Sequence, residues 1–274
     1  WTLTDACGNT TTADQTITIV DTTAPTFTVP ADTTIECDQD ENDLSLTGDV
    51  TDEADNCGSG LEATYADSVT AGACANESLI TRTWTLVDAC GNTTDFDQNI
   101  TVVDTTAPVM DVEASDIVVE CDGSGNNGAI QAWLDTNGGA SATDNCGDVT
   151  WTNDYTGTGS DCANPVTVTF TATDACGNAT TTSATYAIQD TTAPSIDTDA
   201  ADSTVECDGS GNTTDLNDWL ANNGGALASD DCSSISWTND FTALSDDCGS
   251  TGSATVTFTA TDGCGNTATT MATF

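Results

Sequence analysis

Aspartate and cysteine are the residue types of this sequence that could bind or crosslink, because both recur at fixed spacing. The 274 residues include 45 Asp and Glu, 13 Cys and no His, and Arg82 is the one basic residue, so the net charge is −44. Without His or Lys there is no conventional catalytic triad, Schiff base or lysine–asparagine isopeptide crosslink. So large a negative charge favours counterions, and divalent cations are the most effective. Metal binding and disulfide formation are the chemistry to expect.

The cysteines predict a disulfide framework made in an oxidising compartment. No Cys-x-x-Cys pair occurs and histidine is missing, so the usual zinc spacings are absent from the sequence. Regular even sets of cysteines in small domains are typical of extracellular disulfide proteins. Cys7 is left over, and we expect it to be the fourth cysteine of a repeat whose other three lie upstream. The three sets of four are Cys37, Cys57, Cys74 and Cys90; Cys121, Cys146, Cys162 and Cys176; and Cys207, Cys232, Cys248 and Cys264.

The fourth cysteine of each set lies in a motif that recurs through the whole chain. Residues 88–92 read Asp-Ala-Cys-Gly-Asn, and Asp-Thr-Thr-Ala-Pro follows at 104–108. The Gly-Asn pair predicts a tight turn between two strands, and the proline marks a boundary. The chain is therefore predicted to be a tandem array. Its parts are residues 1–20, the last two strands of an incomplete repeat; repeat 1, 21–103; repeat 2, 104–189; and repeat 3, 190–274, truncated at its last strand.

Repeat length and strand patterning predict the fold class. Successive fourth cysteines are 83, 86 and 88 residues apart, which suits one immunoglobulin-type sandwich per repeat. Apolar and polar residues alternate at 84–87 and 99–102, as they do in half-buried strands. We therefore expect an all-β chain of tandem immunoglobulin-like β-sandwiches with two disulfides each.

A short helical insert is predicted in repeats 2 and 3, where an apolar stretch around Trp133 or Trp219 ends at a Gly-Gly pair. Repeat 1 has an acidic loop at 40–43 instead and gives no helix signal. The two tryptophans are expected to pack the helices onto the sandwich. The alternative is that they form exposed platforms for carbohydrate.

An up-and-down strand trace predicts how the cysteines pair. It places the first and third cysteines of a repeat at the bottom of the sandwich, and the second and fourth at the top. Each bond would then close a loop within its repeat and contribute about 3–4 kcal/mol. The predicted bonds are Cys37–Cys74, Cys57–Cys90, Cys121–Cys162, Cys146–Cys176, Cys207–Cys248 and Cys232–Cys264.

The same trace gathers carboxylates at the top of each repeat, next to the linker. Several oxygen ligands that converge from three loops are typical of a calcium site. The alternative is that these Asp and Asn residues only cap turns, which they do well without metal. Their recurrence at the linker favours calcium. The predicted metal residues are Asp21, Asp55 and Asp88; Asp104, Asp144, Asn145 and Asp174; and Asp190, Asp230, Asp231 and Asp262, to which the bottom of repeat 2 adds Glu120, Asp122 and Asp161.

The composition also excludes whole classes of partner. Nucleic-acid affinity comes from phosphate neutralisation by Lys and Arg, which this chain lacks apart from Arg82. Anionic membrane surfaces should repel it, and no apolar run is long enough to span a bilayer. Paired carboxylates could hydrolyse glycosides, but three near-equivalent repeats argue against a single active site. We expect no enzyme, no nucleic-acid partner and no membrane span.

The Asp-x-Cys-Gly-Asn turn, the Asp-Thr-Thr-Ala-Pro linker and the Glu-Cys-Asp strand end resemble the hyalin-repeat and related bacterial immunoglobulin-like tandem repeats. The resemblance covers essentially the whole chain. It implies an extracellular or cell-surface array in very large adhesins or filaments of Bacteroidota-type bacteria. The four-cysteine pattern and the helical insert depart from simpler members, so the ligand preferences of those members do not carry over.

The expected function follows from this resemblance and the residues together. It is a structural segment of an extracellular fibre or adhesin stalk, stiffened by disulfides and calcium. Neighbouring repeats of the same long chain are the expected partners, with other copies in a filament as further candidates. The alternative is a carbohydrate-binding repeat module of a secreted protein.

Overall fold

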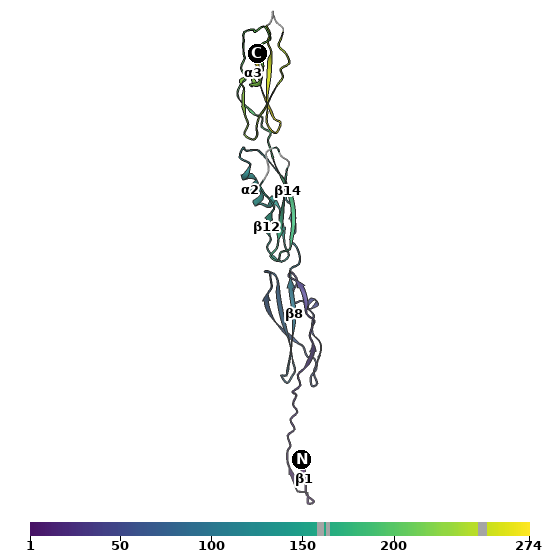
Figure 1. Cartoon of the computed structure of the whole chain (residues 1–274). Helices are drawn as coiled ribbons and strands as arrows, with labels where there is room; N and C mark the ends of the chain where they lie inside the picture. The colour runs from purple at the N-terminus through teal and green to yellow at the C-terminus, as the bar shows by residue number, and fades with distance from the viewer. Residues whose placement is uncertain (158–161, 163–164, 246–250) are drawn as a thin grey trace. The chain divides into compact units, whose positions relative to one another are not determined.

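The computed structural model is drawn in Figure 1 and describes residues 1–157, 162, 165–245 and 251–274. The chain divides into two compact units. Unit 1 comprises Trp1–Ala107, Asp144–Asp148 and Asp174–Asn178, and unit 2 comprises Pro108–Thr143, Val149–Thr173 and Ala179–Phe274. Both are built mainly from β-sheet, which confirms the all-β prediction. The names repeat 1, 2 and 3 refer to the predicted boundaries, which this division does not test.

Repeat 1 forms an immunoglobulin-like sandwich of two sheets in unit 1. Strand β3 pairs with β5, and the second sheet has the order β4-β8-β7-β6, with β4 parallel to β8. Along β7 every second side chain points into the core, as the alternating sequence predicts. The strands of unit 1 are β1 Thr2–Thr4, β2 Thr10–Thr12, β3 Thr26–Thr28, β4 Thr33–Glu36, β5 Thr51–Ala54, β6 Thr64–Ala71, β7 Ser78–Val87 and β8 Thr93–Val103.

The one basic residue is buried in the core of repeat 1. Arg82 is 0% exposed, and its guanidinium donates two hydrogen bonds of 2.9 Å to the carboxylate of Asp67. It also donates to the hydroxyl of Thr47 and to the carbonyl of Glu41, and it lies 4.0 Å from the ring centre of Tyr65. A buried charge is tolerated when it is paired and fully hydrogen-bonded. Arg82 therefore stabilises this sandwich and is not a surface binding group.

Repeat 1 contains a helix where none was predicted. Helix α1, Leu44–Thr47, is a single turn, and the side chain of Asp43 accepts a hydrogen bond from the backbone N–H of Ser45. An aspartate at this position satisfies an N–H group that the helix itself leaves without a partner. One turn is too short to give a periodic apolar pattern, so only the capping residue signalled it.

Unit 2 repeats the same architecture. Strands β9 and β11 form one sheet of repeat 2, and β10-β14-β13-β12 form the other. In repeat 3, β15 pairs with β16, and β17-β18-β19 form the second sheet. The strands are β9 Val109–Val112, β10 Ile117–Glu120, β11 Ser141–Thr143, β12 Thr150–Asn153, β13 Val166–Thr173, β14 Ala179–Gln189, β15 Ser195–Thr198, β16 Leu227–Ser229, β17 Ser236–Asn239, β18 Thr255–Thr261 and β19 Thr267–Thr273.

The predicted helical inserts are present as α2, Asn127–Asp135, and α3, Thr213–Ala221. The 3-10 turns η1, Asn137–Gly139, and η2, Asn223–Gly225, follow them directly, and α2 lies beside the sheet that holds β12 and β14 (Figure 1). The turn needs glycine at Gly138, because its φ is +67° and an added Cβ would lie 3.0 Å from the Phe170 ring. No helix among the described residues has the length and apolarity needed to cross a membrane.

The insert tryptophans pack into the sandwich. Trp133 is 7% exposed, its ring centre lies 5.2 Å from that of Phe170, and its indole N–H donates to the carbonyl of Ser115. Trp219 is partly buried, and its ring centre lies 5.1 Å from that of Phe258. Neither ring is presented as an open platform.

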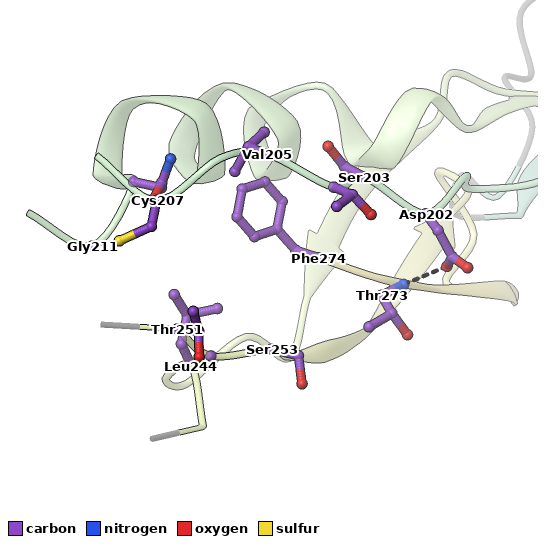
Figure 2. A pocket seen from close by; sticks show the side chains of 13 residues that line it. Asp202, Ser203, Val205, Cys207, Gly211, Leu244, Thr251, Ser253, Thr273 and Phe274 are labelled. Atoms are coloured by element: carbon purple, nitrogen blue, oxygen red, sulfur yellow. Dashed lines mark hydrogen bonds between the residues drawn. The ribbon is translucent and has the colours of Figure 1, made fainter. Parts of the chain in front are cut away.

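A cavity of about 320 Å³ lies beside the last residues of repeat 3 (Figure 2). Figure 2 shows Phe274 and Val205 together at its wall. By cysteine alignment Phe274 is equivalent to Tyr186, and in repeat 2 the strand continues for three residues that pair with β10. One of them, Ile188, is buried. The cavity therefore lies at the place in repeat 3 that residues 187–189 occupy in repeat 2.

Candidate metal centres and their disulfides

The four disulfides found among the described residues join segments that the sequence assigns to consecutive repeats. The first cysteine of one repeat bonds to the second of the next, and the third bonds to the fourth of the next. The predicted pairing within each repeat is therefore wrong for all eight cysteines involved. The bonds, with their Cα–Cα distances, are Cys37–Cys146 (5.9 Å) and Cys74–Cys176 (5.1 Å) in unit 1, and Cys121–Cys232 (6.1 Å) and Cys162–Cys264 (5.4 Å) in unit 2.

Strand pairing explains this connectivity. Because β4 runs parallel to the end of β8, the backbone N–H of Cys37 donates to the carbonyl of Val103, directly before the linker. Cys121 makes the same bond to Gln189. The first cysteine thus lies where the next repeat begins, within reach of its Asp-x-Cys loop. The prediction brought the bottom of one repeat to the top of the next for carboxylates such as Glu120, but it did not extend this contact to the cysteines at the same two ends.

Three further cysteines make no disulfide in the described part of the chain: Cys7, Cys57 and Cys90, all of them exposed. The predicted Cys57–Cys90 bond is therefore not formed. The predicted Cys207–Cys248 bond cannot be compared, because residue 248 lies outside the described residues.

The first carboxylate cluster surrounds Asp104, in the linker between repeats 1 and 2. Asp104 is only 4% exposed. Burial raises its pKa, and the nearby charges of Asp144, Asp174 and Glu36 raise it further. Among the described residues, Oδ2 of Asp104 and Oδ2 of Asp144 are buried and have no hydrogen-bond donor. Two buried, unpaired carboxylate oxygens are costly unless a cation approaches them.

An equivalent cluster in unit 2 surrounds Asp190. Asp190 and Asp230 each place a carboxylate oxygen within 4.8 Å of the other and of the sulfur of Cys232. Oδ2 of Asp190 is also buried without a donor among the described residues. The carboxylate of Glu120 accepts hydrogen bonds from the backbone and hydroxyl of Thr191, so it holds the linker from the side of repeat 2.

A third cluster lies at the start of repeat 1. One carboxylate oxygen from each of Asp21, Asp55 and Asp88 falls within a 4.8 Å group, so the linker, the loop and the turn meet there. Oδ1 of Asp55 is buried and unpaired in the described structure. Each predicted set therefore brings linker, loop and turn aspartates to one end of a repeat.

The turn aspartates Asp88, Asp174 and Asp262 differ from the others. In each Asp-x-Cys-Gly-Asn motif the aspartate accepts hydrogen bonds from the cysteine N–H, the asparagine N–H and the asparagine amide. The bond from the Asn92 amide lowers the pKa of Asp88. That asparagine also donates to the linker carbonyl, for example from Asn178 to Asp104 at 3.0 Å. These three residues shape the turn, as the alternative prediction held, and they add charge beside the linker.

The remaining predicted residues are less central. Asn145 and Asp231 are exposed on the same loops. Asp122 accepts hydrogen bonds from the backbone of Ser124 and Asn126, so it caps the glycine-rich loop. Asp161 lies outside the described residues. Glu36 was missed, although the recurring Glu-Cys-Asp strand end, already used for Glu120, was a sufficient signal.

The donor set suits a hard divalent cation. Calcium takes six to eight oxygens in flexible geometry, and each cluster offers carboxylates from a linker and a loop next to a turn carboxylate. The sulfur atoms beside the clusters around Asp104 and Asp190 are in disulfides, so they are not thiolate ligands for a softer metal.

One family model matches part of the chain by sequence. Residues 25–102 match the HYR-like domain with 4 cysteines. This match and the fold support a tandem immunoglobulin-like repeat protein. No curated protein matches the chain. Among solved structures, the chain is 13% identical to human CDH23 EC21-23 (TM-score 0.31, covering 92% of this chain and 99% of that one). It is 11% identical to Drosophila N-cadherin EC1-4 (TM-score 0.28, 91% and 74%).

Proposed function

We propose that this chain is a structural segment of an extracellular fibre or adhesin stalk, an array of HYR-like repeats whose joints are closed by disulfides and calcium. The observation that carries this proposal is the joint itself. At each described joint two disulfides connect one repeat to the next, beside buried carboxylates of the linker. Such joints serve to hold repeats together and have no evident use in a catalyst.

The disulfides suit a load-bearing role. A pull along the chain is carried across each joint by the linker and by two further covalent bonds. Bonds of this kind persist in an oxidising exterior and not in a reducing cytosol. A bacterial cell surface is the setting that the sequence resemblance implies.

Calcium would complete each joint. Asp104, Asp144 and Glu36 would hold it at the first joint, and Asp190, Asp230 and Glu120 at the second. The bound cation would replace repulsion between these carboxylates with attraction. Calcium sites of extracellular modules have dissociation constants around 10⁻⁴–10⁻³ M, which match a calcium-rich exterior.

Carbohydrate binding has less support. Its only candidate platforms were Trp133 and Trp219, and both pack against core phenylalanines. Their indole N–H groups also donate hydrogen bonds to the backbone carbonyls of Ser115 and Ala201. The proposed partners are therefore neighbouring repeats.

Calcium titration by calorimetry tests the proposal. The wild-type chain should bind calcium at its joints, and the Asp104→Asn/Asp144→Asn variant should lose the site between repeats 1 and 2. Asp218→Asn, on the exposed face of α3, is the matched control and should bind as the wild type does. Equal stoichiometry in all three proteins would refute the calcium part of the proposal.

The mechanical part has a separate test. Small-angle scattering should be recorded with calcium or chelator, on oxidised and on reduced protein. The reduced protein should gain flexibility, and chelation should add to it. If reduction and chelation both leave the maximum dimension unchanged, neither bond type controls the joints.

A further inference from the structure

We infer that Cys57 and Cys90 together form a covalent docking site for a preceding repeat of this kind, which gives its first cysteine to Cys57 and its third to Cys90. The inference rests on the proposed function, in which consecutive repeats are joined end to end. This inference takes the place of the Cys57–Cys90 bond that the sequence predicted.

Cys57 has the same local structure as two cysteines that are bonded to a neighbouring repeat. It follows an Asp-Asn pair, as Cys146 does, and Cys232 follows Asp-Asp. In all three loops the cysteine N–H donates to the carboxylate of the aspartate two residues before it, at 2.8, 2.9 and 2.9 Å. Cys146 and Cys232 receive the first cysteine of the preceding repeat, Cys37 and Cys121.

Cys90 matches Cys176 and Cys264 equally well. In each turn the cysteine N–H donates to the aspartate two residues before it, at 2.8, 2.8 and 2.9 Å. Cys176 and Cys264 receive the third cysteine of the preceding repeat, Cys74 and Cys162. Both described joints thus follow one pairing rule. By this rule Cys57 and Cys90 would bond to the first and third cysteines of a preceding repeat.

The remaining parts of a joint are already assembled around these two thiols. The carboxylates of Asp21, Asp55 and Asp88 meet there, and the amide of Asn92 donates to the carbonyl of Asp21 as its equivalents do at the other linkers. Oδ1 of Asp55 is buried and finds no hydrogen-bond partner in the described part of the chain, like Oδ2 of Asp144. Both thiols are exposed, so a neighbouring repeat could reach them.

The occupant is a repeat that ends at the linker Asp21. Residues 1–20 carry the strand, Asp-Ala-Cys-Gly-Asn turn and strand that close such a repeat, as the antiparallel pair β1–β2. Each new bond removes two hydrogens from two thiols. Glutathione disulfide takes up the two electrons and two protons and leaves as two molecules of glutathione.

The test completes the preceding repeat with the chain's own sequence. A copy of residues 104–169 is placed before Trp1, so that Trp1 takes the position of Phe170. The protein is oxidised in a glutathione redox buffer, digested without reduction and analysed by mass spectrometry. The expected new bonds join the copy of Cys121 to Cys57, and the copy of Cys162 to Cys90.

Single substitutions assign each bond. Compared with the unsubstituted extended chain, Cys57→Ser should add one alkylated residue, the copy of Cys121, and Cys90→Ser should add the copy of Cys162. In the original chain both Cys57 and Cys90 should be alkylated. Cys7 should be alkylated in both proteins, because neither contains the earlier repeat whose third cysteine would bond to it.

Two results would overturn the inference. One is a Cys57–Cys90 bond in the extended chain, and the other is a disulfide dimer of the original chain formed through these residues. If the Cys37–Cys146 and Cys121–Cys232 bonds are present in the same digest, only the docking site fails. If they are missing too, the proposed joints fail with it.

Discussion

Replacing Cys146 with serine distinguishes bonding between repeats from bonding within them. The structure predicts that Cys146→Ser leaves Cys37, 109 residues away, as the new free thiol. Pairing within the repeat would instead release Cys176. Cys176 should remain bonded to Cys74 in the variant, because that bond does not involve the substituted residue.

The expected cost follows from the loop that the bond closes. In the loop-entropy model a loop of about 100 residues contributes about 4.7 kcal/mol. The intact Cys74–Cys176 bond already shortens the path from residue 37 to residue 146, but tens of residues remain in the closed loop. The free energy of unfolding of unit 1 should therefore fall by about 4 kcal/mol.

The assay combines alkylation with chemical denaturation. Folded protein is treated with iodoacetamide and digested without reduction, and the modified cysteines are identified by mass spectrometry, while urea unfolding gives the stability. Cys7→Ser is the matched control, since Cys7 forms no disulfide with any residue that the structure describes, and it should release no other thiol. Alkylated Cys176 in place of alkylated Cys37 would refute the connectivity.

Three other substitutions test the core and the metal site. Arg82→Met should destabilise unit 1 by about 3–5 kcal/mol, because it leaves the carboxylate of Asp67 without its buried partner; a urea midpoint equal to that of wild type would contradict this. Trp133→Ala should lower the free energy of unfolding by about 3–5 kcal/mol because it opens a cavity in the core. Scanning calorimetry should then show the unfolding transition of repeat 2 at a lower temperature than in the wild type. Asp104→Asn should act in opposite directions with and without calcium. Its raised pKa means that the charged carboxylate opposes folding above that pKa, so the variant should melt higher than wild type in chelator and lower in calcium, whereas Asp218→Asn should change neither melting temperature.

The strands and the long inserts could be predicted because each depends on a local pattern. The alternation in β7 and the Gly-Gly pair after α2 are visible over a few residues. Helix α1 was missed because four residues carry no period, and Asp43 alone signalled it. Local rules thus identified the elements that are long enough to show a period.

The disulfides could not be predicted in the same way. A regular array repeats its cysteines at the same interval whether they bond within a repeat or across a joint. Only the parallel pairing of β4 with β8 shows that Cys37 lies beside the linker. The pairing is a property of two adjacent repeats, and the sequence of one repeat does not contain it.

The candidate metal residues were predicted as groups, but their individual roles were not. Sequence reasoning gathered Asp104, Asp144 and Asp174 at one end of repeat 2. It could not tell that the turn donates hydrogen bonds to both carboxylate oxygens of Asp174. Asp104 and Asp144, by contrast, each have one oxygen without a donor among the residues that the structure describes. That distinction depends on where individual backbone N–H groups point. Calcium itself stays a prediction.

The bonds between repeats also change what a protease could do to the chain. Thr105 and Thr106 are the exposed residues of the linker, between the buried Asp104 and Pro108, and exposed backbone between domains is where proteolytic nicking concentrates. A cut there would leave both sides attached through Cys37–Cys146 and Cys74–Cys176. The two fragments would separate only after reduction, so an array of this kind could be nicked at a linker without losing the part that lies beyond the cut.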